Sequence, residues 1–288
     1  MRSEGCHHAR VYHHSVFSST SSEMNRLEQQ LAEMQRTHVR ALTLFLTAGF
    51  PDAGSTVDLV LRLEEAGADI IEIGMPFSDP LADGPVIQQC SAVALKNGVT
   101  LDKIFAYVTA IRKRSQIPLV LMGYVNPVLR FGVDRFFDEA RDVGVDGVIF
   151  PEIPLEEVMI FGPAIESRGL SNIMLVTPTS SPDRISAIDR QSSGFLYCVS
   201  VTGVTGMTKA PPAVDYIRNV KQHARKNPVL VGFGISKPED VHRVAGEADG
   251  VIVGSALLKK LGDGVPRAEL LNWVGEMKNA LRNNGSSS

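Results

Sequence analysis

The feature that most constrains the fold is a regular recurrence of short apolar segments. Eight such segments, rich in Val, Ile and Leu, are separated by stretches with helical periodicity: 41–49, 68–74, 118–124, 147–152, 173–178, 194–200, 228–234 and 250–256. They are almost continuously apolar, which is typical of parallel strands buried on both faces. Eight strand–helix units in roughly 240 residues predict an α/β protein that forms a closed (β/α)8 TIM barrel rather than an open doubly wound sheet.

The two ends of the chain differ from this repeating region. Residues 1–23 are rich in Ser and His and lack apolar periodicity, so we expect a disordered N-terminal extension or a misassigned start. A metal-binding tail and a plastid transit peptide are weaker alternatives. Residues 24–35 carry Leu and Met at helical spacing and predict an extra helix that closes the barrel's N-terminal end. Residues 24–282 are therefore expected to form one catalytic domain, and residues 283–288 a frayed tail.

Composition excludes several classes of function. The chain has 288 residues and a formal net charge of -3, so it lacks the net positive charge that would attract nucleic acid or an anionic membrane. No apolar run reaches the roughly 18 residues needed to cross a bilayer. Cys6, Cys90 and Cys198 are far apart and lack CxxC spacing, which predicts a reduced, cytoplasmic protein without a zinc site.

The second apolar segment leads into a loop that carries several carboxylates. Glu72 lies within the strand segment 68–74, where loss of hydration should raise its pKa toward the range useful for proton transfer. Asp79 and Asp83 follow in a loop rich in Gly and Pro. Considered alone, Asp79 is more simply interpreted as an exposed loop residue or as a helix cap. Chemistry in a barrel of this kind is located at the C-terminal ends of the strands, so we expect a catalytic carboxylate pair there.

Glycines at the ends of the last three strand segments suggest a phosphate site. Gly206, Gly234 and Gly254 would let backbone N–H groups approach an anion at a helix N-terminus. Ser236 and Ser255 are expected to cap the helices that follow and to orient their N–H groups toward the ligand. The segment 203–213, with small residues and prolines, is expected to form a mobile lid over the site.

Several motifs resemble one known family. They are EIGMPFSDPLADGP, YVNP, SVTGVTG, GFGIS and DGVIVGSA, and the likeness extends from about Met24 to about Leu281. Together they are similar to the tryptophan synthase alpha subunit. The resemblance implies a carbon–carbon lyase that cleaves indole-3-glycerol phosphate into indole and glyceraldehyde 3-phosphate by a reversed aldol reaction.

The resemblance also implies roles for particular residues. Glu72 and Asp83 match the catalytic carboxylates. The residues expected to bind substrate are Tyr197, Thr205, Gly206, Phe233, Gly234, Gly254 and Ser255. The residues expected to contact a beta subunit are Asp79, Pro80 and Asn126. Two positions depart from the common family pattern: Glu152 replaces an Asp, and Lys209 lies where Arg is frequent.

The chemistry implied by the resemblance agrees with the residue types. A buried Glu72 that is partly protonated and an ionised Asp83 can divide the proton transfers. No Lys ends any of the eight segments, which argues against an imine-forming aldolase. We expect no metal and no cofactor in this chain, and pyridoxal phosphate in the beta subunit of an α2β2 heterotetramer.

Three alternative functions remain. They are a free-standing lyase that releases indole, a non-catalytic regulatory barrel, and a sugar-phosphate isomerase. The isomerase is disfavoured because an apolar lining large enough for indole is expected from Phe45, Leu121, Tyr197 and Phe233.

Overall fold

Eight parallel strands form a closed barrel. The computed structural model describes residues 24–199, 214–232 and 234–282. The strands are β1 (Ala41–Thr47), β2 (Ile70–Gly74), β3 (Leu119–Met122), β4 (Gly147–Ile149), β5 (Ser171–Val176), β6 (Leu196–Val199), β7 (Val229–Gly232) and β8 (Gly250–Val253). Each strand pairs with the next in the sequence, and β8 pairs with β1. The prediction of a (β/α)8 TIM barrel is confirmed.

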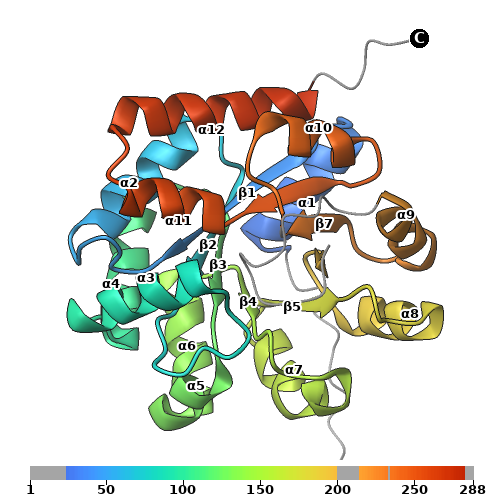
Figure 1. The fold of residues 1–288 in the computed structure, drawn as a ribbon. Coiled ribbons are helices and arrows are strands. Elements are labelled where there is room, and N and C mark those ends of the chain that lie inside the picture. The colour runs from blue at the N-terminus through green and yellow to red at the C-terminus, as the bar shows by residue number, and fades with distance from the viewer. Residues whose placement is uncertain (1–23, 200–213, 233, 283–288) are drawn as a thin grey trace, which may run out of the picture.

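The helices form a ring around these strands (Figure 1). They are α1 (Arg26–Arg36), α2 (Ser55–Glu65), α3 (Pro85–Lys96), α4 (Leu101–Arg112), α5 (Val125–Phe131), α6 (Val133–Val143), the 3-10 turn η1 (Leu155–Glu157), α7 (Val158–Glu166), α8 (Pro182–Gln191), α9 (Val214–His223), α10 (Pro238–Ala245), α11 (Ser255–Gly262) and α12 (Arg267–Arg282). The expected extra helix is α1, whose Asn25 side chain accepts a hydrogen bond from the backbone N–H of Glu28 at 3.0 Å.

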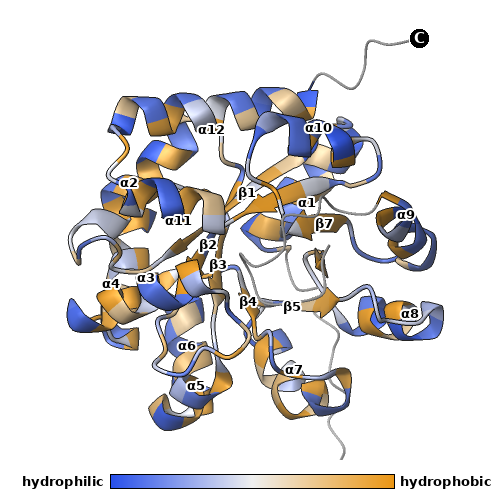
Figure 2. Ribbon diagram, in the orientation of Figure 1, coloured by the Kyte–Doolittle hydropathy of each residue, from blue (hydrophilic) through white to orange (hydrophobic). Residues whose placement is uncertain are grey.

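The strands are apolar throughout because they contact two separate cores. In β2, Ile71 and Ile73 point outward into the larger core beneath the helices. Ile70 points inward, into a smaller core inside the barrel that also receives Leu27 and Leu31 of α1. Figure 2 shows the same division, with apolar strands at the centre and helices that are apolar on one side and hydrophilic on the other.

The connection from β2 to β3 is longer than one helix. It contains the loop 75–84, then α3 and α4. Pro85 starts α3 at a position where its missing N–H costs nothing, directly after the expected catalytic loop. This insertion places Asp83 two residues before the start of α3, at the C-terminal end of the barrel.

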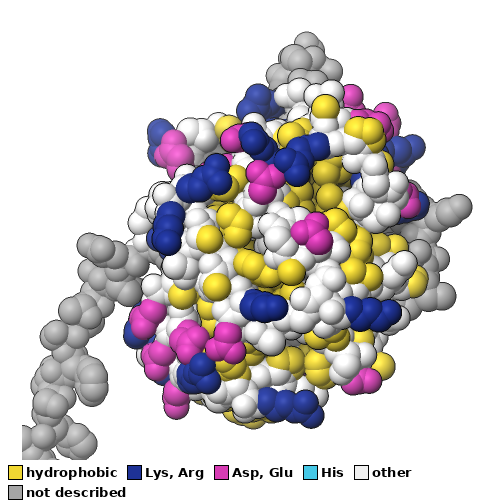
Figure 3. Space-filling model, turned by 90° about the vertical axis from the view of Figure 1, so that its left-hand side faces the viewer, with side chains coloured by type: hydrophobic (Ala, Val, Ile, Leu, Met, Phe, Trp, Pro, Cys, Tyr) yellow, Lys and Arg dark blue, Asp and Glu magenta, His cyan; other side chains and the backbone are white. Residues whose placement is uncertain are grey.

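The molecular surface carries both signs of charge. On the face drawn in Figure 3, Lys and Arg side chains are interspersed with Asp and Glu, in keeping with the net charge of -3. Within the described ranges, no helix has both the length and the apolar character that crossing a membrane requires. The extension 1–23 and the tail 283–288 lie outside the described residues.

Candidate active site

Glu72 lies inside the barrel, in the middle of β2. Its strand neighbours are Phe45 on β1 and Val120 on β3. Alternate residues of a strand point to the same face, and in β2 the inward-facing residues are Ile70, Glu72 and Gly74. The Glu72 carboxyl group therefore faces the barrel interior. Glu72 is completely buried, and its two carboxyl oxygens have no hydrogen-bond partner among the described residues.

This burial determines the protonation state of Glu72. Removal from water raises the pKa of the carboxyl group from its usual 4.5 to about 8, and no cation among the described residues offsets the effect. The group is therefore mostly protonated at pH 7. The raised pKa agrees with the sequence prediction for this position, and a neutral carboxylic acid is chemically able to donate a proton.

Asp83 is held at the rim of the barrel by Tyr124. The Tyr124 hydroxyl hydrogen-bonds the Asp83 side chain and accepts a hydrogen bond from the backbone N–H of Ala82 at 2.8 Å. The ring of Tyr124 also packs against Phe77, with centroids 5.2 Å apart. Tyr124 thus fixes the loop 75–84 against the end of β3. Tyr124 belongs to the YVNP motif and was not predicted to have a role, although its place at the end of a barrel strand was the available signal.

Asp83 also has a raised pKa, but less so than Glu72. Burial raises the pKa of Asp83 from 3.8 to about 6; the hydrogen bond from Tyr124 opposes this, and the charge of Glu152 adds to it. At pH 7, Asp83 is ionised while Glu72 is protonated. Two carboxyl groups in different environments therefore have different protonation states near neutral pH.

Tyr197 connects the two carboxyl groups electrostatically. It lies on β6 and is buried in the barrel interior. Its pKa is raised well above the ordinary value of 10, first by burial and then by the charges of Glu72 and Asp83. A Cβ atom on Gly232 of β7 would lie 2.3 Å from the Tyr197 hydroxyl oxygen, so only glycine there leaves room for the ring. The structure thus brings together Glu72, Asp83 and Tyr197.

The apolar lining agrees with the sequence prediction at one position and differs at another. Phe45 lines a small pocket that also contains Asp83 and Met122. Leu121 does not reach this pocket, because it points outward into the core beneath the helices. The prediction for Leu121 was wrong by one residue, and the inward side chain at this end of β3 is that of Met122.

The ends of β7 and β8 offer backbone groups rather than cations. Gly254 is the N-cap of α11 and, as a glycine, has no side chain that could accept a hydrogen bond from the helix. Ser255 is the first helical residue. The first N–H groups of α11 are thus left without a side-chain acceptor at the C-terminal end of the barrel. Gly234 has a φ of 74°, in the left-handed region that favours glycine.

Two expected caps differ from the structure. Ser255 does not cap α11, since the N-cap is Gly254. Ser236 does not cap α10 either. The Asp240 carboxylate accepts hydrogen bonds from the Ser236 N–H and hydroxyl, both at 3.0 Å, and from the Lys237 N–H at 3.2 Å. The N-terminus of α10 therefore already holds an anion from its own first turn, which leaves α11 as the available helix end.

The three expected partner-contact residues lie on the outer rim near Asp83. Asp79 is exposed, and its carboxylate accepts a hydrogen bond from Ser78 at 2.7 Å. Pro80 is partly exposed in the same loop. Asn126 is exposed but belongs to the first turn of α5, not to a loop as expected.

Glu152 has a local structural contact. Its carboxylate accepts a hydrogen bond from the Val125 backbone N–H at 2.5 Å, at the start of α5. Burial raises the pKa of Glu152, and this hydrogen bond opposes the increase. The side chain therefore joins the end of β4 to the end of β3.

Some expected site residues fall outside the part of the chain that the structure describes. They are Thr205, Gly206, Lys209 and Phe233, together with the rest of the segment 203–213. Within residues 24–199, 214–232 and 234–282, no group of three or more His, Cys, Asp or Glu side chains is arranged to hold a metal ion.

The fold and site together define a class of protein. A closed (β/α)8 barrel with a protonated carboxyl group inside it, an ionised one in the loop after the same strand, and an uncapped helix N-terminus after β8 is typical of barrel enzymes that act on phosphorylated substrates.

Comparison with known proteins identifies the family. The family model described as "Tryptophan synthase alpha chain" matches residues 31–282. The tryptophan synthase alpha chain of Citrifermentans bemidjiense is 46% identical over 261 residues, covering 90% of this chain and 97% of the relative. The crystal structure of the alpha chain from Legionella pneumophila is 34% identical and covers 92% of this chain and 100% of the other, with a TM-score of 0.83. A structure of tryptophan synthase from Mycobacterium tuberculosis contains a chain that is 38% identical, covering 90% of this chain and 99% of the other, with a TM-score of 0.82.

The chain belongs to the tryptophan synthase alpha chain family. The family predicted from the sequence motifs is confirmed, and the regulatory-barrel and isomerase alternatives are not favoured.

Proposed function

We propose that this chain cleaves indole-3-glycerol phosphate into indole and glyceraldehyde 3-phosphate, as the alpha subunit of a tryptophan synthase. The observation that carries the proposal is the pair of carboxyl groups with separated pKa values, about 8 for Glu72 and about 6 for Asp83. Such a pair supplies an acid and an ionised acceptor at the same pH.

The reaction requires that one proton be delivered to the indole ring and that one be removed from the glycerol hydroxyl group. Glu72 in its protonated form delivers a proton to C3 of the indole ring. Asp83, as a carboxylate, accepts a hydrogen bond from the ring N–H and stabilises the positive charge that builds there. The bond between C3 and the glycerol carbon then breaks, its electron pair returns to the ring, and the neighbouring hydroxyl becomes the aldehyde. The carboxylate of Glu72 takes the hydroxyl proton and is ready for another cycle.

The remaining residues bind the two ends of the substrate. Phe45 and Tyr197 supply aromatic surface for the indole ring. Gly254 and Ser255, with Gly234 beside them, offer backbone N–H groups to the phosphate at the start of α11. By the family pattern, we assign Thr205, Gly206 and Phe233 to the same substrate site.

A beta subunit is the proposed partner of this chain. We place its contact on the rim that includes Asp79, Pro80 and Asn126, because these positions are exposed or partly exposed beside the loop that holds Asp83. The assembly is then an α2β2 heterotetramer, with pyridoxal phosphate in the beta subunit and none in this chain. Residues 24–282 form the catalytic unit, and its location is the cytoplasm.

The experiment that tests the function is indole release from indole-3-glycerol phosphate by the purified chain. Glu72→Gln and Asp83→Asn should each lower turnover by about two orders of magnitude or more, the scale expected for losing a general acid or base. Glu276→Gln, at an exposed position on α12, is the matched control and should keep full turnover. Near wild-type turnover by Glu72→Gln would overturn the assignment.

A further inference from the structure

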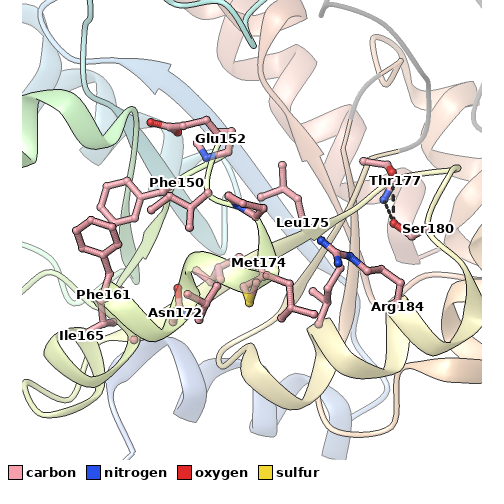
Figure 4. Close-up of a pocket in the computed structure, with 18 of the residues that line it drawn as sticks. Phe150, Glu152, Phe161, Ile165, Asn172, Met174, Leu175, Thr177, Ser180 and Arg184 are labelled. Carbon is pink, nitrogen blue, oxygen red and sulfur yellow. Dashed lines mark hydrogen bonds between the residues drawn. The ribbon is translucent and has the colours of Figure 1, made fainter.

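A second cavity lies outside the barrel, between β4 and β5 and the helices α7 and α8. Its volume is about 510 Å³, within the range of small-molecule sites. Phe150 and Phe161 form one side of it, with ring centroids 6.4 Å apart. Figure 4 shows Arg184, Thr177 and Ser180 on the opposite side. None of Phe45, Glu72, Asp83 and Tyr197 lines this α7–α8 cavity.

The cavity has a polar group without a partner at its inner wall. Asn172 lies on the outward face of β5, next to Met174, and is 7% exposed. Its backbone N–H and C=O are hydrogen-bonded to the hydroxyl groups of Ser193 and Ser192. Its side-chain carboxamide makes no hydrogen bond with any described residue. The carboxamide is therefore open to the cavity, where it can hydrogen-bond to a ligand.

The charged and polar groups at the cavity rim are already paired. Arg184 donates from both terminal nitrogens to the two carboxylate oxygens of Glu156. The Ser181 side chain accepts from the backbone N–H of Arg184 at 3.3 Å and so caps α8. The Ser180 hydroxyl accepts from the Thr177 N–H at 3.1 Å. No free cation or helix end faces the cavity from these groups, which favours an uncharged ligand over a phosphate or carboxylate.

We propose that the α7–α8 cavity binds an uncharged heteroaromatic molecule of the size of indole, whose ring lies against Phe150 and Phe161 and whose N–H donates to the Asn172 carboxamide. The aromatic walls supply the apolar contact, and Asn172 supplies the single directional hydrogen bond. The choice of indole among such molecules rests on the proposed function. Pro151 lines both this cavity and the catalytic pocket, so the second site lies directly beside the first.

Two methionines allow the two sites to be observed separately. Met174 lines the α7–α8 cavity, and Met122 lines the catalytic pocket. In protein labelled with [13C-methyl]methionine, titration with indole should shift the Met174 methyl resonance saturably through the ring current of the bound molecule. The Met122 resonance reports binding in the catalytic pocket in the same spectrum. The two resonances are assigned by the variants Met174→Leu and Met122→Leu.

The hydrogen bond is tested with a variant and with a modified ligand. Asn172→Leu should weaken the binding reported by Met174 by about fivefold or more, and leave the binding reported by Met122 unchanged. On the wild-type protein, 1-methylindole, which lacks the N–H, should show the same loss. Val158→Phe, which fills the cavity and keeps Asn172, should abolish the Met174 shift and serves if Asn172→Leu does not fold.

The proposal is overturned if the Met174 resonance stays unmoved while Met122 saturates, because the cavity then holds only solvent. It is also overturned if indole and 1-methylindole bind equally well at Met174 in wild-type and Asn172→Leu proteins. Neither result bears on lyase activity, which is measured independently by indole release, so failure of this site and failure of the proposed function are distinguishable.

Discussion

Replacing Glu72 by Gln should remove a pH-dependent loss of stability. In the unfolded chain, the Glu72 carboxyl group titrates near its usual 4.5, whereas in the folded barrel burial raises the pKa to about 8. Between these two values, the unfolded state has released the proton and the folded state still holds it. The free energy of unfolding therefore falls as pH rises from 4.5 to 8. Below pH 4.5 both states hold the proton, so this loss of stability does not occur.

The size of this effect follows from the two pKa values. At about 1.4 kcal/mol for each pH unit, the loss reaches about 3 kcal/mol at pH 7 and about 5 kcal/mol above pH 8. Gln has nearly the same shape and does not ionise. The unfolding free energy of Glu72→Gln relative to wild type should therefore increase by about 3 kcal/mol between pH 5 and pH 7, while indole release is lost.

The assay is urea unfolding followed by far-UV circular dichroism at pH 5, 6 and 7 and constant ionic strength. Glu276→Gln is the control, and its stability should run parallel to that of wild type. If the difference between Glu72→Gln and wild type stays constant over this range within about 0.5 kcal/mol, then Glu72 is not buried as a protonated acid and the reasoning fails.

Three further predictions concern the phosphate site, the barrel interior and the partner surface. Gly234→Val should weaken inhibition by inorganic phosphate at least tenfold, whereas Gly264→Val, at a similarly positive φ of 69° away from the strand ends, should not; equal inhibition constants for the two variants would exclude Gly234 from the site. Gly232→Ala should lower stability by about 1 to 3 kcal/mol in thermal unfolding, because its new Cβ meets the Tyr197 hydroxyl at 2.3 Å; an unchanged melting temperature would show that the ring moves freely. A beta subunit should raise indole release severalfold and Asn126→Asp should reduce that stimulation, whereas a chain that is fast alone and unaffected by any beta subunit would favour a free-standing lyase.

The barrel was predictable because its physical signal is repeated eight times. Each strand contacts two cores, so each appears in the sequence as an apolar run, and the number of runs indicates closure. Glu72 stood out for the same reason, since a carboxyl group inside such a run has no solvent and no adjacent cation. The position of Asp83 followed from the Pro and Gly that end its loop and start α3.

Other features depend on details that a continuously apolar run does not carry. Leu121 and Met122 are both apolar, so only the register of β3 against its neighbours decides which one faces the site. The cap of α10 was misassigned because the N-cap is Lys237, and the Ser236 hydroxyl donates to the Asp240 carboxylate instead of accepting from the first turn. Whether the Asn172 side chain finds a hydrogen-bond partner depends on how α7 and α8 pack over β5, which local periodicity does not specify.

The most direct test of the account is the pH dependence of kcat/KM for indole-3-glycerol phosphate cleavage. An ionised Asp83 and a protonated Glu72 predict a bell-shaped profile that falls below pH about 6 and above pH about 8. Tyr124→Phe removes the hydrogen bond that lowers the pKa of Asp83, so the acidic limb should move to higher pH while the basic limb stays in place. A profile that is flat from pH 5 to 9, or a basic limb that moves in Tyr124→Phe, would contradict the assignment of the two carboxyl groups.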